Sequence, residues 1–165
     1  MSIPKHILFE RVSPSTPGKL NAPTFAYLCL YGKLPPGGSL WGRGAAHEEV
    51  IWNGVGIDKA IPIKALDDLK AISKIELRSS CQGGDKDHPT YVIFRLKSHS
   101  EEESEKLANT LNSKYPKNLS SCSGIGNMGL PRIIVVTKLW YSDKNASKFE
   151  KWWLGLANKI KSCLV

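Results

Sequence analysis

One short segment occurs twice in the chain, and its residue types suit the binding of an anion. The copies are Ser79-Ser80-Cys81-Gln82-Gly83 and Ser120-Ser121-Cys122-Ser123-Gly124. Serine hydroxyls donate hydrogen bonds to phosphate or carboxylate groups, and glycine permits the close backbone approach of an anion-binding concavity. We therefore predict two loops that bind a nucleotide, a nucleic acid or another anionic ligand through Ser79, Ser80, Cys81, Gly83, Ser120, Ser121, Cys122 and Gly124. Two tight turns would explain the serines and glycines without a ligand, but turns do not call for the cysteine.

The first copy continues into a loop with acid–base side chains, Asp85, Asp87 and His88. Two carboxylates beside an imidazole can act as general acid and base, so these residues are the candidates for catalysis. A solvated loop of turn-forming residues explains them as well, and we favour that interpretation over an enzyme. Ligands drawn from Cys81, Cys122 and His88 match no zinc-binding spacing, so we expect neither a metal nor another cofactor.

Positive charge is concentrated near the C-terminus. The chain has 23 Lys and Arg against 15 Asp and Glu, a net charge of +8, and nine of the basic residues but only two acidic ones follow Ser113. The candidate nucleic-acid-binding residues lie in one predicted helix: Lys144, Lys148, Lys151, Trp152 and Lys159. The lysines would follow a phosphate backbone and Trp152 would stack on a base. A solvated helix with a packed tryptophan, or a membrane-surface helix, is the alternative.

We expect an α+β fold to position these groups. After each Ser-Ser-Cys segment come a proline, an apolar strand and a serine that caps a helix, namely Pro89 and Ser100 in the first copy and Pro131 and Ser142 in the second. The pattern predicts a strand-loop-strand-helix unit used twice, over residues 75–114 and 118–164. Such a unit would form a mainly antiparallel sheet with helices packed on one face.

The remaining elements are predicted from local patterns. Residues 1–60 are expected to form a β-rich extension on a core of residues 61–165, with strands at 6–12, 24–31 and 49–52. Asn53-Gly54 is typical of a hairpin turn, and Pro62 of the start of a helix. Ser100 with Glu103 forms a capping box, and Ser142 or Asp143 is expected to cap the last helix.

The sequence also points to a location in the cell. It contains no run of 18 apolar residues that would predict a membrane span. The N-terminal segment reaches Glu10 before a signal-peptide core could form. The cysteines Cys29, Cys81, Cys122 and Cys163 are scattered singly. We therefore expect a cytoplasmic protein with free, largely buried thiols.

The repeated segment resembles a known signature. Ser120-Ser121-Cys122-Ser123-Gly124 is similar to the Ser-Ser-Cys-Ser-Gly-Arg motif of the wybutosine-synthesising tRNA methyltransferase family, although Ile125 replaces its arginine. The resemblance implies, as an alternative function, an RNA-modifying enzyme that uses S-adenosylmethionine. The first copy also resembles a Ser-Cys-x-Gly-His pattern of small uncharacterised phage and bacterial proteins, with Gly84 in place of the histidine. That likeness implies a third possibility, a non-catalytic partner-binding protein of viral or phage type.

Overall fold

The structure is a computed structural model, and it describes residues 20–37 and 47–164. The predicted strand at 6–12 lies outside the described residues. The helices are α2 (Ala22–Tyr31), α3 (Ile63–Lys70), α4 (Glu101–Lys114) and α5 (Ala146–Cys163), with a short 3-10 turn η1 (Asn127–Gly129). The strands are β1 (Glu49–Trp52), β2 (Val55–Asp58), β3 (Ile75–Cys81), β4 (Tyr91–Leu96), β5 (Ser120–Ile125) and β6 (Pro131–Val136).

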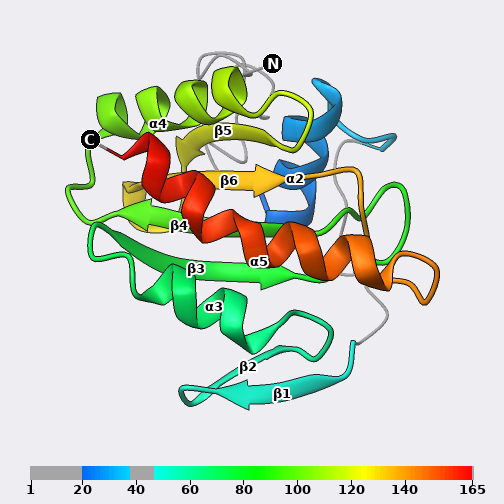
Figure 1. The fold of residues 1–165 in the computed structure, drawn as a ribbon. Coiled ribbons are helices and arrows are strands. Elements are labelled where there is room, and N and C mark those ends of the chain that lie inside the picture. Colours follow the sequence, from blue (N-terminus) through cyan, green and yellow to red (C-terminus); the bar gives the residue numbers. More distant parts are fainter. Residues whose placement is uncertain (1–19, 38–46, 165) are drawn as a thin grey trace.

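A four-stranded antiparallel sheet with the order β3-β4-β6-β5 forms the centre of the molecule (Figure 1). The chain makes a hairpin followed by a helix twice, first as β3-β4-α4 and then as β5-β6-α5. The predicted α+β class with an antiparallel sheet is thereby confirmed. Strands β4 and β6 are central, and their residues are buried on both faces apart from Arg132, as expected for such apolar strands.

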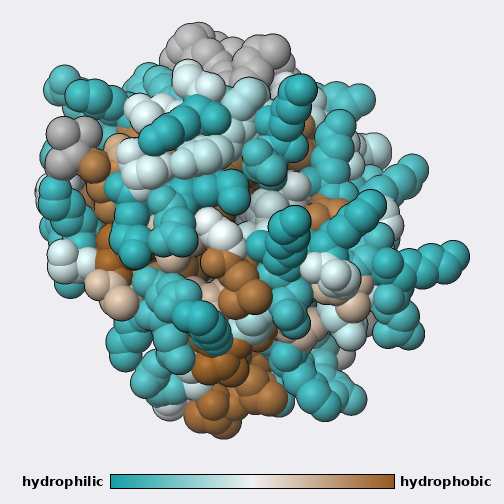
Figure 2. All heavy atoms as spheres, viewed as in Figure 1, coloured by the Kyte–Doolittle hydropathy of each residue, from teal (hydrophilic) through white to brown (hydrophobic). Residues whose placement is uncertain are grey.

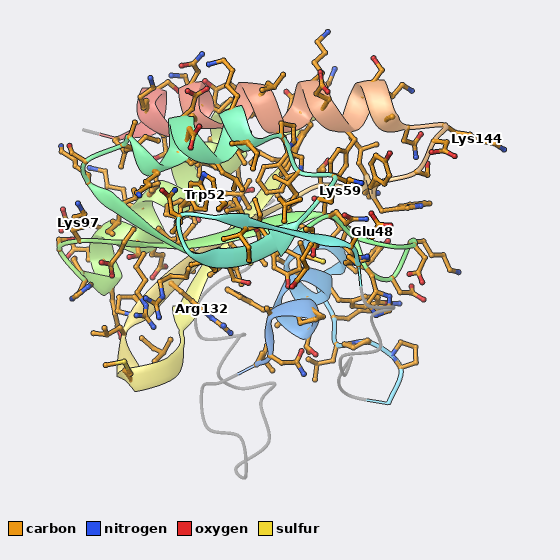
Figure 3. All side chains as sticks on the ribbon, turned by 90° about the horizontal axis from the view of Figure 1, so that it is seen from below. Glu48, Trp52, Lys59, Lys97, Arg132 and Lys144 are labelled. Carbon is orange, nitrogen blue, oxygen red and sulfur yellow. The ribbon has the colours of Figure 1, made fainter. Side chains whose placement is uncertain are left out.

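Both faces of the sheet are covered by helices. Helices α3, α4 and α5 pack on one face around a core that includes Leu66, Leu111 and Trp153. Helix α2 packs on the opposite face, where Phe25 and Leu28 meet Ile93 and Ile134. Figure 3 shows this layering, with α3 and α5 on one side of the sheet and α2 on the other. None of the helices in the described part of the chain has the length and apolar character needed to span a bilayer.

The prediction of a strand at 24–31 is wrong, because this segment is helix α2. The Asn21 side chain accepts a hydrogen bond from the Thr24 amide and caps the helix, and Gly32 ends it with φ 73°. All residues from Thr24 to Cys29 are buried. A segment that is apolar on every side has no periodicity to separate a buried helix from a buried strand, so only the caps identified it. The described part of residues 1–60 is thus one helix and the β1-β2 hairpin rather than mainly strands.

Two local predictions that depend on specific turn and cap residues are confirmed. Strands β1 and β2 pair across Asn53 and Gly54, whose φ angles of 50° and 80° suit a hairpin turn. The Ser100 hydroxyl caps α4 by accepting a hydrogen bond from the Glu103 amide. The predicted cap of the last helix is wrong. Helix α5 begins after Asn145, and the Ser142 hydroxyl accepts a hydrogen bond from the Asn145 amide in the turn before it.

Candidate functional site

The two Ser-Ser-Cys segments are strands rather than loops, which overturns that prediction. The first ends β3 and the second begins β5, and each pairs in register with a neighbouring strand. Because β3 and β5 are opposite edges of the sheet, Cys81 and Cys122 are separated by three inter-strand spacings, about 14 Å across the sheet. The segments therefore do not converge on a shared cleft.

The second segment is part of the core. Ser121 and Cys122 are both 0% exposed. The Asn112 side chain of α4 donates to the Ser121 carbonyl and accepts from its amide, at 2.7 and 2.8 Å, and the Ser121 hydroxyl donates to Ile134 O at 2.8 Å. Burial raises the pKa of the Cys122 thiol well above its ordinary value, with Cys29 beside it as the next cause. These groups hold β5 in place and are not available to a ligand from solvent.

The loop that holds the catalytic candidates is organised by one carboxylate. Asp85 Oδ1 accepts hydrogen bonds from the Asp87 and His88 amides and lies 2.9 Å from His88 Nδ1. The hydrogen bond from His88 is the main reason why the pKa of Asp85 is lowered. The Asp85 carboxylate therefore stabilises the turn in its ionised form, as the turn-forming interpretation expects, and it is a poor proton donor at neutral pH.

The candidate nucleic-acid-binding lysines and Trp152 do not share one exposed helix face. Lys144 precedes α5 and is exposed, as are Lys148 and Lys151 within the helix, while Lys159 lies with its Nζ 5.6 Å from the centre of the Tyr115 ring. Trp152 is only 8% exposed, and its Nε1 donates to Asn118 O at 2.9 Å. The prediction that Trp152 stacks on a base is therefore wrong, because its ring packs in the core.

Cys81 has quite different surroundings from Cys122, although all four cysteines are free thiols. It is half-buried, and its Sγ lies 3.9 Å from His47 Nε2. The ligand atoms of His47, Asp58 and Cys81 all lie within 4.8 Å of one another, so these residues could hold a metal ion. Burial raises the pKa of Cys81 to about 11, and the Asp58 carboxylate adds to the shift against one amide hydrogen bond that opposes it. The thiol is thus protonated at neutral pH and is a weak nucleophile.

A pocket that the sequence analysis did not anticipate lies on the α2 face of the sheet. It has a volume of about 410 Å³ and is lined by Leu20, Asn21, Ala22, Arg78, Ser79, Ile93, Arg95 and Arg132. Its three arginines come from β3, β4 and β6, which are adjacent strands. Arg78 is exposed at an irregularity in β3 between Leu77 and Ser79, whereas Arg95 is only 5% exposed.

The Arg132 guanidinium contacts a backbone carbonyl and an aromatic ring. Its Nη2 donates to Leu20 O, and its Cζ lies 4.5 Å from the centre of the Phe25 ring. Its buried Nε has no hydrogen-bond partner among the described residues. Burial lowers the pKa of Arg132 to about 10, and the neighbouring Arg95 contributes to this by repulsion. A Cβ at Gly126 would lie 2.8 Å from Arg132 Cδ, so the absence of a side chain there leaves room for the arginine.

The surface also carries an apolar patch on the β1-β2 hairpin and the adjoining α3. Ile51 is 75% exposed and Val55 59% exposed in the hairpin, and Ile63 at the start of α3 is 41% exposed. Figure 2 shows apolar side chains gathered in this region, while most of the surrounding surface is hydrophilic.

A sequence signal for the arginine pocket did exist. Arg95 and Arg132 are the charged residues of otherwise apolar central strands, and a buried charge in such a place requires a compensating group. No family model matches this chain, and no curated protein or solved structure matches it either. The functional argument therefore depends on the site itself.

Proposed function

We propose that this protein binds a phosphate-bearing ligand, a nucleotide or a nucleic acid, in the pocket formed by Arg78, Arg95 and Arg132. The observation that carries the proposal is the presence of three arginines around one pocket; burial lowers the pKa of Arg132, and repulsion by the neighbouring Arg95 adds to this. Like charges held together in this way are stabilised by an anion between them. Guanidinium groups also form paired hydrogen bonds with phosphate oxygens.

Other features of the pocket favour an anion. Asn21 and Ala22 at the N-terminus of α2 line it, and a helix N-terminus attracts negative charge. Ser79, one of the ligand residues expected from the sequence, lines it as well and is exposed. The volume of about 410 Å³ is within the usual range for small-molecule sites. Among the described residues, neither Arg78 nor Arg132 forms an ion pair with a carboxylate.

The lysines of α5 have a separate part in this proposal. Arg132 lies on the α2 side of the sheet, whereas Lys144 lies just before α5 on the other side (Figure 3). The lysines therefore do not touch the phosphate that the arginines bind. Together with the net charge of +8 they contribute long-range attraction toward a polyanion.

The proposal is tested by anisotropy titrations of a fluorescein-labelled single-stranded RNA, with ATP as competitor. Arg78→Gln removes an exposed guanidinium from the pocket, so we expect the Kd to rise roughly 10- to 100-fold, as for the loss of a charge-assisted hydrogen bond. Lys64→Gln is the matched control, since it removes the same charge from α3 on the far face of the sheet. Displacement by ATP would identify a mononucleotide site, and its absence would indicate RNA phosphates.

Two results would contradict this function. One is an affinity that stays constant as salt rises, because phosphate contacts release counterions and weaken steeply with salt. The other is an equal loss of RNA affinity in Arg78→Gln and Lys64→Gln. That result would mean that the net positive charge attracts the RNA non-specifically and that the pocket does not bind it. Titration with S-adenosylmethionine, the cofactor implied by the resemblance to the tRNA methyltransferase family, tests the enzymatic alternative by calorimetry.

A further inference from the structure

Three potential metal ligands meet where the β1-β2 hairpin contacts the end of β3. His47 lies just before β1, Asp58 ends β2 and Cys81 ends β3. Backbone hydrogen bonding from Lys59 to Glu48 extends the hairpin to its open end, which brings His47 and Asp58 to the same place. The Gln82 amide donates to Asp58 Oδ2 at 2.8 Å, and this bond joins the hairpin to β3. The fold thus assembles imidazole, carboxylate and thiol from three separate segments.

The distances are close to those of a tetrahedral metal site. With Zn–S about 2.3 Å and Zn–N about 2.0 Å, tetrahedral geometry places sulfur and nitrogen about 3.5 Å apart. Cys81 Sγ and His47 Nε2 are 3.9 Å apart, and the Asp58 oxygen is within 4.8 Å of both. Half-buried side chains that move by about 0.4 Å for the sulfur–nitrogen pair and by up to about 1.5 Å for the Asp58 oxygen would bring all three ligands to tetrahedral spacing around one ion.

The backbone around Cys81 is arranged to hold a thiolate ligand. The Gly83 amide donates to Cys81 Sγ at 3.3 Å, and hydrogen bonds of this kind orient and stabilise metal ligands. Gly83 has φ 79°, and a Cβ there would lie 2.7 Å from His88 O, so the turn that aims this amide at the sulfur requires glycine. The Thr90 hydroxyl donates to Cys81 O at 2.6 Å and anchors the residue from the other side.

The donor set also decides which metal ion would fit this place. A divalent ion deprotonates a coordinating thiol and compensates the negative charges of a thiolate and a carboxylate. The thiol excludes magnesium and calcium as natural occupants, whereas nitrogen, oxygen and sulfur together suit zinc.

We propose that His47, Asp58 and Cys81 bind one zinc ion, with a fourth position open to water or an external ligand. Three protein ligands and an open position are the pattern of zinc sites that act on or bind another molecule. Ser79 of the arginine pocket lies two residues from Cys81 on the same face of β3, a separation of about 7 Å. The zinc site uses none of the pocket residues, so it stands independently of the phosphate-binding proposal.

Cobalt substitution tests this site directly. The full chain, freed of metal with a chelator and kept reduced, is titrated with Co²⁺ and then with competing Zn²⁺. We expect one equivalent of cobalt to give a near-ultraviolet thiolate-to-metal absorption band that zinc abolishes. Cys81→Ser should remove the band, and His47→Gln and Asp58→Asn should raise the Kd for cobalt at least about tenfold.

The controls use the same residue types elsewhere in the chain. His99→Gln changes an exposed imidazole and Cys163→Ser a buried thiol, and both should leave the Kd within about twofold of the original protein. Circular dichroism checks that each variant is folded. If Cys81→Ser does not fold, the cobalt Kd of His47→Gln tests the site instead, because the His47 side chain lies outside the core and its replacement should not affect folding. No band, a band retained in Cys81→Ser, or an unchanged Kd in His47→Gln would overturn the proposal.

Discussion

A buried hydrogen-bond chain joins α5 to Cys81, the cysteine of the proposed zinc site, through one threonine. Thr90 is 0% exposed, and its hydroxyl accepts from Trp153 Nε1 at 3.0 Å and donates to Cys81 O at 2.6 Å. Thr90→Val keeps the shape of the side chain but breaks both bonds. An indole N–H left unpaired in the core costs about 1–3 kcal/mol, and the lost bond to the carbonyl about 1 kcal/mol more. We therefore expect the free energy of unfolding to fall by about 2–4 kcal/mol.

Urea denaturation followed by tryptophan fluorescence measures this loss. Thr90→Ser is the matched control, because it keeps the hydroxyl and removes only a methyl group, which costs about 1 kcal/mol. The valine variant must therefore be clearly less stable than the serine variant. If serine proves as costly as valine, packing rather than hydrogen bonding is the role of Thr90, and the reasoning is refuted.

Three further predictions concern single contacts. Gly83→Ala should cost about 1–3 kcal/mol in the same assay, because it places a Cβ at φ 79° against His88 O; no loss would show that the turn relaxes. Asn112→Ala should cost about 2–4 kcal/mol through the lost bonds to the Ser121 backbone, whereas the exposed Asn109→Ala on the same helix should change stability by less than about 0.5 kcal/mol. His88→Ala should raise the lowered pKa of Asp85 in an NMR titration. Because the pKa of Asp85 is depressed in the folded state, its stabilising contribution is present above its unfolded pKa and is lost as pH falls through the folded value. If the pKa of Asp85 is unchanged in His88→Ala, groups other than His88 lower the pKa of this carboxyl.

Much of the fold follows from signals that lie within a few residues of one another. The Ser100 cap of α4, the Asn53-Gly54 turn and the proline before α3 each act locally, so the sequence predicts them correctly. Helix α2 was misjudged for the opposite reason. A uniformly apolar segment packs equally well as helix or strand, and only its contact with the sheet on one side and its caps decide the matter.

The sequence by itself determined one side chain that could do chemistry, an unexplained cysteine before a glycine, but it did not lead to the prediction of the pocket arginines, His47 or Asp58 as site residues. Only the tertiary structure decided which of these residues meet. Strand register set Arg78, Arg95 and Arg132 around one pocket, and the docking of a hairpin brought His47 and Asp58 to Cys81. The tertiary structure also placed Cys81 and Cys122 on opposite edge strands of the sheet, although the repeated segment had suggested that both belong to the ligand-binding site. The physical reason is that pairing between distant strands depends on burial across the whole sheet, and a short sequence pattern carries no information about it.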